Sequence, residues 1–417
     1  MRRILGLSLS VLSAWCFIYL ALHPGFYATS INSEFFAPSL FIAALVHCLL
    51  RPRREMFAVA ALASLLLIGD FAHLGVRPTF SSVLSMVGLA SLILLPFTAV
   101  VERDREVRKR VLIGFFVSLV FAVSYFFAGN MLDYTARRNP MVLDLYLYSF
   151  DCSLGFQPSF AMGQLFGGWF GKVSLWFYIG LPIPLALVFV QQLRRASRVA
   201  LDSGLAFLIA GPLGVLFYNQ FPAVGPVHVF QGFPVPRLSV AQVAHLRLEA
   251  IPATAPRNAM PSLHMGWIIL AMFYARGLSR PVRIFTWVFC FFVFCATLGT
   301  GEHYLVDLVA SFPFVLLIAS ACAFELPLKT PSRIFGILFG LGLLEAWFSV
   351  LRNYIPLMWQ NMSLPWVLTL GTIFCCLIAQ RWLMRDVIAT EASRSLNATS
   401  AGALAQVAAE GSRQPAE

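Results

Sequence analysis

The amino-acid sequence predicts an all-α integral membrane protein with about 12 transmembrane helices. Of its 417 residues, 59% are hydrophobic and only 12% are charged, whereas a soluble domain carries about 25% charged residues. The mean hydropathy of +0.78 agrees with this composition. A helix that crosses a bilayer needs about 20 largely apolar residues. Stretches of this kind lie near residues 4–23, 35–50, 56–74, 80–101, 111–132, 173–191, 203–221, 261–276, 283–299, 303–324, 333–351 and 364–382.

The distribution of basic residues indicates how these helices are oriented. With the N-terminus in the cytoplasm and the sides alternating, 22 of the 30 Lys and Arg residues fall on the cytoplasmic side. The other eight lie outside, namely Arg77, Arg137, Arg138, Lys172, Arg237, Arg247, Arg257 and Arg352. Cytoplasmic loops are enriched in Lys and Arg, so we expect an even number of spans with both termini in the cytoplasm, in a bacterial inner membrane. The net charge of +11 then reflects topology, and no nucleic acid partner is expected.

The segments outside the apolar stretches differ in composition. The N-terminus has two arginines and then an apolar run without a small-x-small cleavage site, which predicts a retained first helix. Within residues 133–172, tyrosines and acidic residues alternate around 144–151, which suits a helix at the membrane interface. Residues 222–260 are rich in Pro, Gly and Val and predict a loop that walls a site at the outer face. Residues 388–417 are rich in Ala and Ser and predict a disordered cytoplasmic tail.

Two short polar segments interrupt the apolar sequence and carry its candidate chemistry. The second of them, residues 299–307, contains His303 and Asp307. This i, i+4 spacing puts both side chains on one face of a helix. A carboxylate there can accept a hydrogen bond from one imidazole nitrogen, which fixes the tautomer and leaves the other nitrogen free to attack. Gly301 allows a close approach of backbone and ligand.

The first polar segment, residues 257–264, predicts the start of a helix. Ser262 follows a proline and suits a helix N-terminus, where backbone amides and the helix dipole favour anions. His264 falls in the first turn, from which it can protonate a leaving oxygen. Arg257 can hold phosphate oxygens in a bidentate manner. One hairpin of two spans separates the two segments, so we expect both at the same depth on the extracytoplasmic side.

These residues resemble two motifs of the type 2 phosphatidic acid phosphatase superfamily. The sequence Pro-Ser-Leu-His at 261–264 is similar to its second motif, and His303 with Asp307 is similar to the end of its third. The resemblance implies that His303 is the nucleophile that becomes phosphohistidine, that Asp307 orients it and that His264 protonates the leaving group. It also implies a six-helix catalytic core over residues 111–325. Four helices then precede the core in residues 1–110, and two follow it in residues 326–387.

The sequence also departs from the superfamily pattern. Thr297 stands where the third motif has its phosphate-binding arginine, and Leu263 replaces a glycine of the second. These departures, and the phrase Phe-Pro-Ala-Val-Gly-Pro at 221–226, resemble a branch that includes inositol phosphorylceramide synthases, which are inositolphosphotransferases of sphingolipid metabolism, and more distantly sphingomyelin synthases. Arg257 is then the first choice for the missing phosphate-binding cation. Weaker candidates on outer segments are Lys172, Arg237 and Arg247.

The sequence therefore predicts a membrane enzyme that acts on a lipid phosphate or phospholipid at the extracytoplasmic face. The phosphate-bearing group would pass through phosphohistidine to water or to an alcohol such as inositol, and this chemistry needs neither a metal nor a cofactor. The alternative is a polytopic transporter without catalytic activity, for which the intramembrane residues Asp70 and Glu345 would act as relays. Against it, the two halves show no repeat of the kind that many transporters have. Interhelical hydrogen bonds are the preferred explanation for both acidic residues.

Overall fold

The computed structural model describes residues 36–51, 54–74, 79–195, 199–230, 233, 249–250 and 255–411. This part of the chain is mostly helical, and the first predicted span, residues 4–23, lies outside it. Each of the other predicted spans coincides with a helix or with a pair of helices. The physical reason is that a long apolar segment in a bilayer satisfies its backbone polar groups only by forming a helix.

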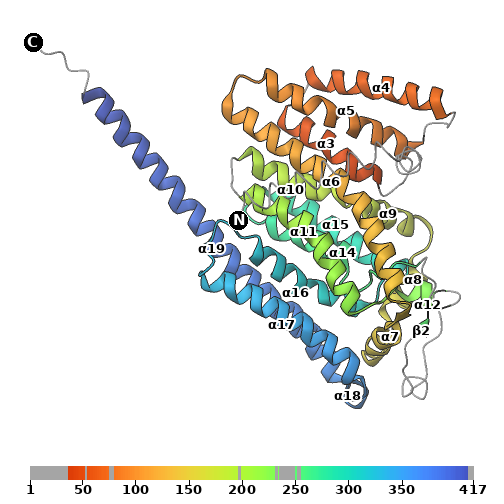
Figure 1. Cartoon of the computed structure of the whole chain (residues 1–417). Coiled ribbons are helices and arrows are strands. Elements are labelled where there is room, and N and C mark those ends of the chain that lie inside the picture. Colours follow the sequence, from red (N-terminus) through yellow and green to blue (C-terminus); the bar gives the residue numbers. More distant parts are fainter. Residues whose placement is uncertain are drawn as a thin grey trace, which may run out of the picture.

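Four helices form an N-terminal unit, drawn red to orange in Figure 1. They are α3 (Phe36–Leu50), α4 (Arg54–Leu74), α5 (Phe80–Val101) and α6 (Arg105–Arg138). Their facing side chains form a hydrophobic cluster of their own. Asp104 caps α6, because its carboxylate accepts the N–H groups of Glu106 at 2.8 Å and Val107 at 3.1 Å. Three of these helices, α3 to α5, are among the four that the sequence predicts before the core, and the fourth, 4–23, lies outside the described residues. The helix α6 contains the span 111–132, with which the predicted core begins, so the structure packs the first helix of the predicted core into the N-terminal unit.

The central part of the chain begins with short helices. They are α7 (Asp144–Ser153), α8 (Pro158–Leu165), α9 (Gly168–Ile179) and α10 (Pro182–Arg194). The helices α9 and α10 meet at an angle of 46°, so the predicted span 173–191 is a bent pair rather than one straight helix. Gly180 and Pro182 lie at this bend, and a proline removes a backbone donor that a continuous helix would use.

The remaining central elements pack around the largest hydrophobic core. They are α11 (Val199–Gln220), α12 (Pro226–Val229), α14 (Leu263–Tyr274), α15 (Arg280–Gly299) and α16 (Leu305–Ala321). The predicted spans 261–276 and 303–324 start a little too early, because both polar segments form turns and the helices α14 and α16 begin after them. A two-residue antiparallel ladder joins β1 (Met141–Val142) to β2 (Glu249–Ala250), with Met141 opposite Ala250.

Three helices complete the chain. They are α17 (Pro331–Asn353), α18 (Ile355–Gln360) and α19 (Ser363–Gly411). Gln220 of α11 donates a hydrogen bond to Glu345 of α17, which confirms the interhelical bond expected for this acidic residue. The structure differs from the disordered tail that the sequence predicts from residue 388, because α19 continues to Gly411 and projects away from the helical body (Figure 1). Alanine, the best helix former, is frequent in this stretch.

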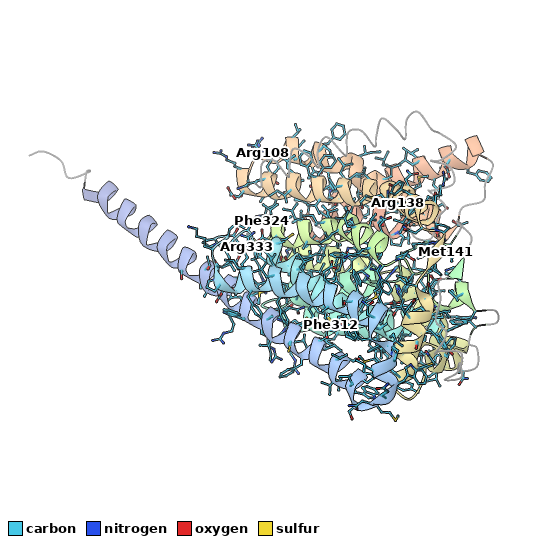
Figure 2. All side chains as sticks on the ribbon, turned by 60° about the horizontal axis from the view of Figure 1, so that its bottom comes forward. Arg108, Arg138, Met141, Phe312, Phe324 and Arg333 are labelled. Atoms are coloured by element: carbon cyan, nitrogen blue, oxygen red, sulfur yellow. The ribbon has the colours of Figure 1, made fainter. Side chains whose placement is uncertain are left out.

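The two ends of the bundle agree with the alternation of sides inferred from charge. Arg108 and Arg333, both predicted to be cytoplasmic, lie at one end, and Arg138 and Met141 lie at the other (Figure 2). The short elements α7, α8 and α12 gather near β2 (Figure 1), the strand with which Met141 pairs.

The described helices identify a multi-pass membrane protein. Seven of them are long and apolar enough to cross a bilayer, and the bent pair of α9 and α10 would make an eighth span. The helices α3, α14 and α16 are apolar but shorter, with 15, 12 and 17 residues. The total of 12 spans and the six-helix core remain predictions.

Candidate active site

His303 lies in the turn before α16, and its side chain is buried. Its Nδ1 is 3.0 Å from the carbonyl oxygen of Ala259 and 3.5 Å from Oδ2 of Asp307. A carbonyl oxygen can only accept a hydrogen bond, so Nδ1 carries the proton that it donates. In the neutral ring, Nε2 therefore holds the lone pair. The hydroxyl of Ser262 is 3.2 Å from Nε2 and is the donor to it.

Asp307 is the third residue of α16 and is fully buried. Its Oδ2 accepts the N–H of Tyr304 at 2.8 Å, while its Oδ1 has no hydrogen-bond partner among the described residues. The i, i+4 spacing predicts the proximity of Asp307 to His303. It does not predict that a backbone carbonyl lies closer to Nδ1 than the carboxylate does, so carbonyl and carboxylate together orient the imidazole.

Ser262 joins the two polar segments. It is the N-cap of α14, where its side chain accepts the N–H of Met265 at 3.4 Å. Its own N–H donates to the carbonyl oxygen of Asp307 at 3.3 Å. The hydroxyl of Ser311 lies 2.9 Å from the carbonyl oxygen of Ser262 and 3.0 Å from that of Asp307, and can donate to either. The first turns of α14 and α16 are therefore fixed against each other, as the hairpin argument predicts for segments at the same depth.

His264 lies in the first turn of α14, beside this arrangement. Its ring stacks on that of Tyr178 in α9, with centroids 3.8 Å apart and an interplanar angle of 15°. Its side chain is partly exposed, unlike that of His303, and the two imidazoles are close enough to interact electrostatically. The structure thus brings together His303, Asp307, Ser262 and His264, which the sequence singled out, and adds Tyr178, which it did not.

The nearby segments of α7 to α16 match a known family. Residues 145–321 match the model of the PAP2 superfamily. This match supports the superfamily that the two motifs suggested, over the part of the chain that holds both histidines. No curated protein and no solved structure matches the chain significantly. The narrower resemblance to inositol phosphorylceramide and sphingomyelin synthases remains a prediction.

The turn around Gly301 is held by α12. Gly301 has φ of 76°, a conformation that favours glycine, and its carbonyl oxygen accepts the N–H of Val227 at 2.9 Å. The next residue, Glu302, pairs with His228 of α12, with 3.5 Å between Oε2 and Nε2. The hydrogen bond with Glu302 raises the pKa of His228. Both side chains of this pair are partly exposed.

Arg257 is fully buried. It donates to the carbonyl oxygens of Asn139 at 2.9 Å, Ala255 at 2.6 Å and Pro140 at 3.3 Å. Burial lowers its pKa, and the nearby Asp144 opposes this shift. A phosphate would have to share or displace these carbonyl groups. Lys172, a weaker candidate, is exposed on α9, while Arg237 and Arg247 lie outside the described residues.

Sequence reasoning missed the side chains of α7 and α8 that contact the segments around His303. Ser159 of α8 donates from its hydroxyl to the carbonyl oxygen of His303 at 2.9 Å. Asp144 and Asp151 of α7 are fully buried. Burial raises the pKa of Asp144 to about 7 and that of Asp151 well above its usual range. The only available signal was a pair of acidic residues seven apart in a largely apolar helix, which a helix at the membrane interface also explains.

Proposed function

We propose that this protein is a membrane lipid phosphatase or phosphotransferase that forms a phosphohistidine on His303 at the extracytoplasmic face. One observation carries the proposal. The Nδ1 proton of His303 is held by a backbone carbonyl and a buried carboxylate, so that Nε2 presents a lone pair beside Ser262. An oriented imidazole without its own proton at the reacting nitrogen is the arrangement that nucleophilic catalysis requires.

The reaction follows from this geometry in two steps. In the first, Nε2 of His303 attacks the phosphorus, a P–N bond forms, and the bond from phosphorus to the leaving oxygen breaks. Protonated His264 gives its proton to that oxygen. In the second step, water or an alcohol attacks the phosphorus and passes its proton to His264, and the P–N bond breaks. Inositol is the acceptor that we propose on the branch resemblance, and water makes the same enzyme a phosphatase.

Three residues are proposed to hold the phosphate. The Ser262 hydroxyl already lies 3.2 Å from Nε2 and can turn to a phosphate oxygen once the substrate enters. Gly301 lies two residues before His303 and would offer its backbone to the ligand, since the ring of Phe233 packs on the side where a Cβ atom would stand, 3.1 Å from that position. Arg257 supplies positive charge to the same segment. The first-turn amides of α14 add to these groups, because the first N–H groups of a helix lack partners within it and favour anions.

The replacement of Arg257 by lysine tests its part in this proposal. We expect R257K to raise KM for a lipid phosphate by about 10-fold and to leave kcat almost unchanged, because lysine keeps the charge but loses the bidentate geometry. Steady-state kinetics on the purified protein measures both constants.

Arg333 provides the matched control for this variant. It is also buried, and it donates to three carbonyl oxygens, those of Ser320, Ala321 and Leu326, at the opposite end of the bundle (Figure 2). R333K therefore reports the structural cost of losing such an arginine. If R257K lowers Tm as R333K does and leaves KM at the wild-type value, Arg257 has a structural role and does not bind phosphate.

A substrate screen tests the function itself. The purified protein in lipid nanodiscs is incubated with phosphatidic acid, phosphatidylinositol and phosphatidylcholine, with and without free inositol. We expect release of phosphate or of a phosphorylated head group, or its transfer to inositol. Flux of a lipid or solute across liposomes, without turnover of any of these lipids, would instead support the transporter alternative.

A further inference from the structure

We propose that the outer helix α7 positions the nucleophile, with Asp151 and Asp144 as positioning residues that hold the two loops around His303. This inference rests on the function proposed above for His303. It assigns a role to two buried carboxylates that do not themselves touch the reacting atoms.

Asp151 caps a helix to which it does not belong. Its Oδ2 accepts the N–H of Leu305 at 2.7 Å, and its Oδ1 accepts the N–H of Val306 at 3.2 Å. These are the first two residues of α16, whose amides have no partner within the helix. The N-cap residue Tyr304 offers no side-chain cap bond to replace them. Asp151 therefore fixes the backbone immediately after His303.

The backbone of His303 itself is held by the neighbouring helix α8. Ser159, in the helix after α7, donates to the carbonyl oxygen of His303 at 2.9 Å. The chain is thus held at His303 and at the two amides that begin α16. A main chain with hydrogen bonds on both sides of the reacting residue leaves the imidazole little freedom to leave the geometry in which Nδ1 faces Ala259.

Asp144 holds the opposite loop in the same way. It lies two helical turns before Asp151, on the same face of α7, and it accepts the N–H groups of Val224 at 3.1 Å and Gly225 at 2.8 Å. Gly225 has φ of 96° and packs directly on the backbone of Glu302, where a Cβ atom would come within 2.2 Å of the carbonyl oxygen. Asp144 therefore holds the loop at 224–225 in contact with Glu302, the residue before His303.

Aromatic packing keeps α7 itself in place. Tyr148 lies between the two aspartates and is fully buried. Its ring contacts Phe160 of α8, with centroids 5.4 Å apart, and Phe230 beside α12, at 4.7 Å. Such contacts are directional and add to the apolar burial. These contacts hold α7 in the position from which both carboxylates contact the loops.

The burial of two carboxylates in α7 costs free energy unless hydrogen bonds compensate for the lost hydration. A buried ionised carboxylate loses its hydration, and its neighbours must replace it. Both carboxylates also lie close enough to Asp307 to interact with its charge, which is a further cost. Groups of this kind are typical of functional sites. A displacement of about 1 Å in reacting groups can lower a rate by about 100-fold. The bonds from α7 would therefore raise the rate by keeping His303 aligned with the phosphate.

The variant D151N tests this inference. Asparagine keeps the size of the side chain but has only one oxygen to accept the N–H groups of Leu305 and Val306. We expect kcat to fall by roughly 30-fold to 100-fold and KM to change by less than about 3-fold, because binding groups stay in place while the nucleophile is less well aligned. The measurements are kcat, KM and the rate of phosphoenzyme formation on the folded full chain, with phosphatidic acid or phosphatidylinositol, whichever the wild-type protein turns over faster.

Asp104 provides the control for the loss of a capping charge, because Oδ1 of its exposed carboxylate accepts two amides at a helix start, at 2.8 and 3.1 Å, but in α6 at the other end of the bundle. D104N should keep wild-type kcat. If D151N does not fold, S159A decides, with an expected loss of kcat of about 10-fold. Wild-type kcat in D151N or S159A, or an equal loss in D104N, overturns the positioning role. A wild-type protein that turns over no lipid in the screen overturns the proposed function and this inference with it.

Discussion

Replacement of His303 by asparagine is expected to abolish turnover of lipid phosphates, with a loss of at least about 10⁴-fold in kcat, as for the loss of other nucleophiles. Asparagine keeps an N–H group that can donate to the carbonyl oxygen of Ala259, so the turn before α16 should stay folded. The variant has no nitrogen with a lone pair in the place of Nε2, and the P–N bond cannot form. Phosphate release, and incorporation of ³²P from a labelled lipid into the protein, measure this result.

His47 provides the control for the loss of a buried histidine. It is fully buried in α3, within the N-terminal unit, where its Nε2 is 3.5 Å from the hydroxyl of Thr98. H47N should keep kcat close to the wild-type value, whatever it does to Tm. A folded H303N protein that retains full turnover, or an acid-labile phosphoenzyme that forms as readily in H303N as in the wild type, would show that the nucleophile lies elsewhere.

The positions of the helices could be predicted from hydrophobicity, because membrane spans depend on the length and composition of a segment alone. The apolar stretch at 80–101, for example, becomes α5 over Phe80–Val101. Details that depend on tertiary contacts could not be predicted in this way. The bend between α9 and α10 lies within one continuous apolar stretch, and α14 and α16 are short because their first residues form the turns of the site.

The candidate site could be predicted only where its residues are close in sequence or share a motif. The spacing of His303 and Asp307 predicts their contact, and Ser262 predicts a helix start, which the N-cap of α14 confirms. The carbonyl of Ala259 and the carboxylate of Asp151 reach His303 and its neighbours from 44 and 154 residues away. Such contacts are set by the packing of α7 and α14 against α16, for which local sequence gives no pattern.

Replacement of His264 by glutamine is expected to lower turnover by about 10²-fold to 10⁴-fold for a natural lipid, the usual range for a general acid. The loss should depend on the leaving group. A lipid alkoxide is a poor leaving group and needs the proton of His264, whereas p-nitrophenolate leaves without help. The rate of the first step with p-nitrophenyl phosphate should therefore fall much less than the rate with the lipid. The comparison of single-turnover rates for the two substrates measures this difference.

The second step gives an independent test of the same residue. Water or alcohol that attacks the phosphohistidine has to lose a proton, so H264Q should accumulate phosphoenzyme from p-nitrophenyl phosphate while the wild-type protein does not. Tyr178 supplies the control, because its ring stacks on His264 at 3.8 Å. Y178F keeps the stacked ring and should keep most of the activity, while Y178L removes the stack and should show a weaker form of the H264Q defect. An equal loss on both substrates in H264Q, without accumulated phosphoenzyme, would show that His264 binds the substrate and moves no proton, because proton transfer is the only one of these roles that depends on the leaving group.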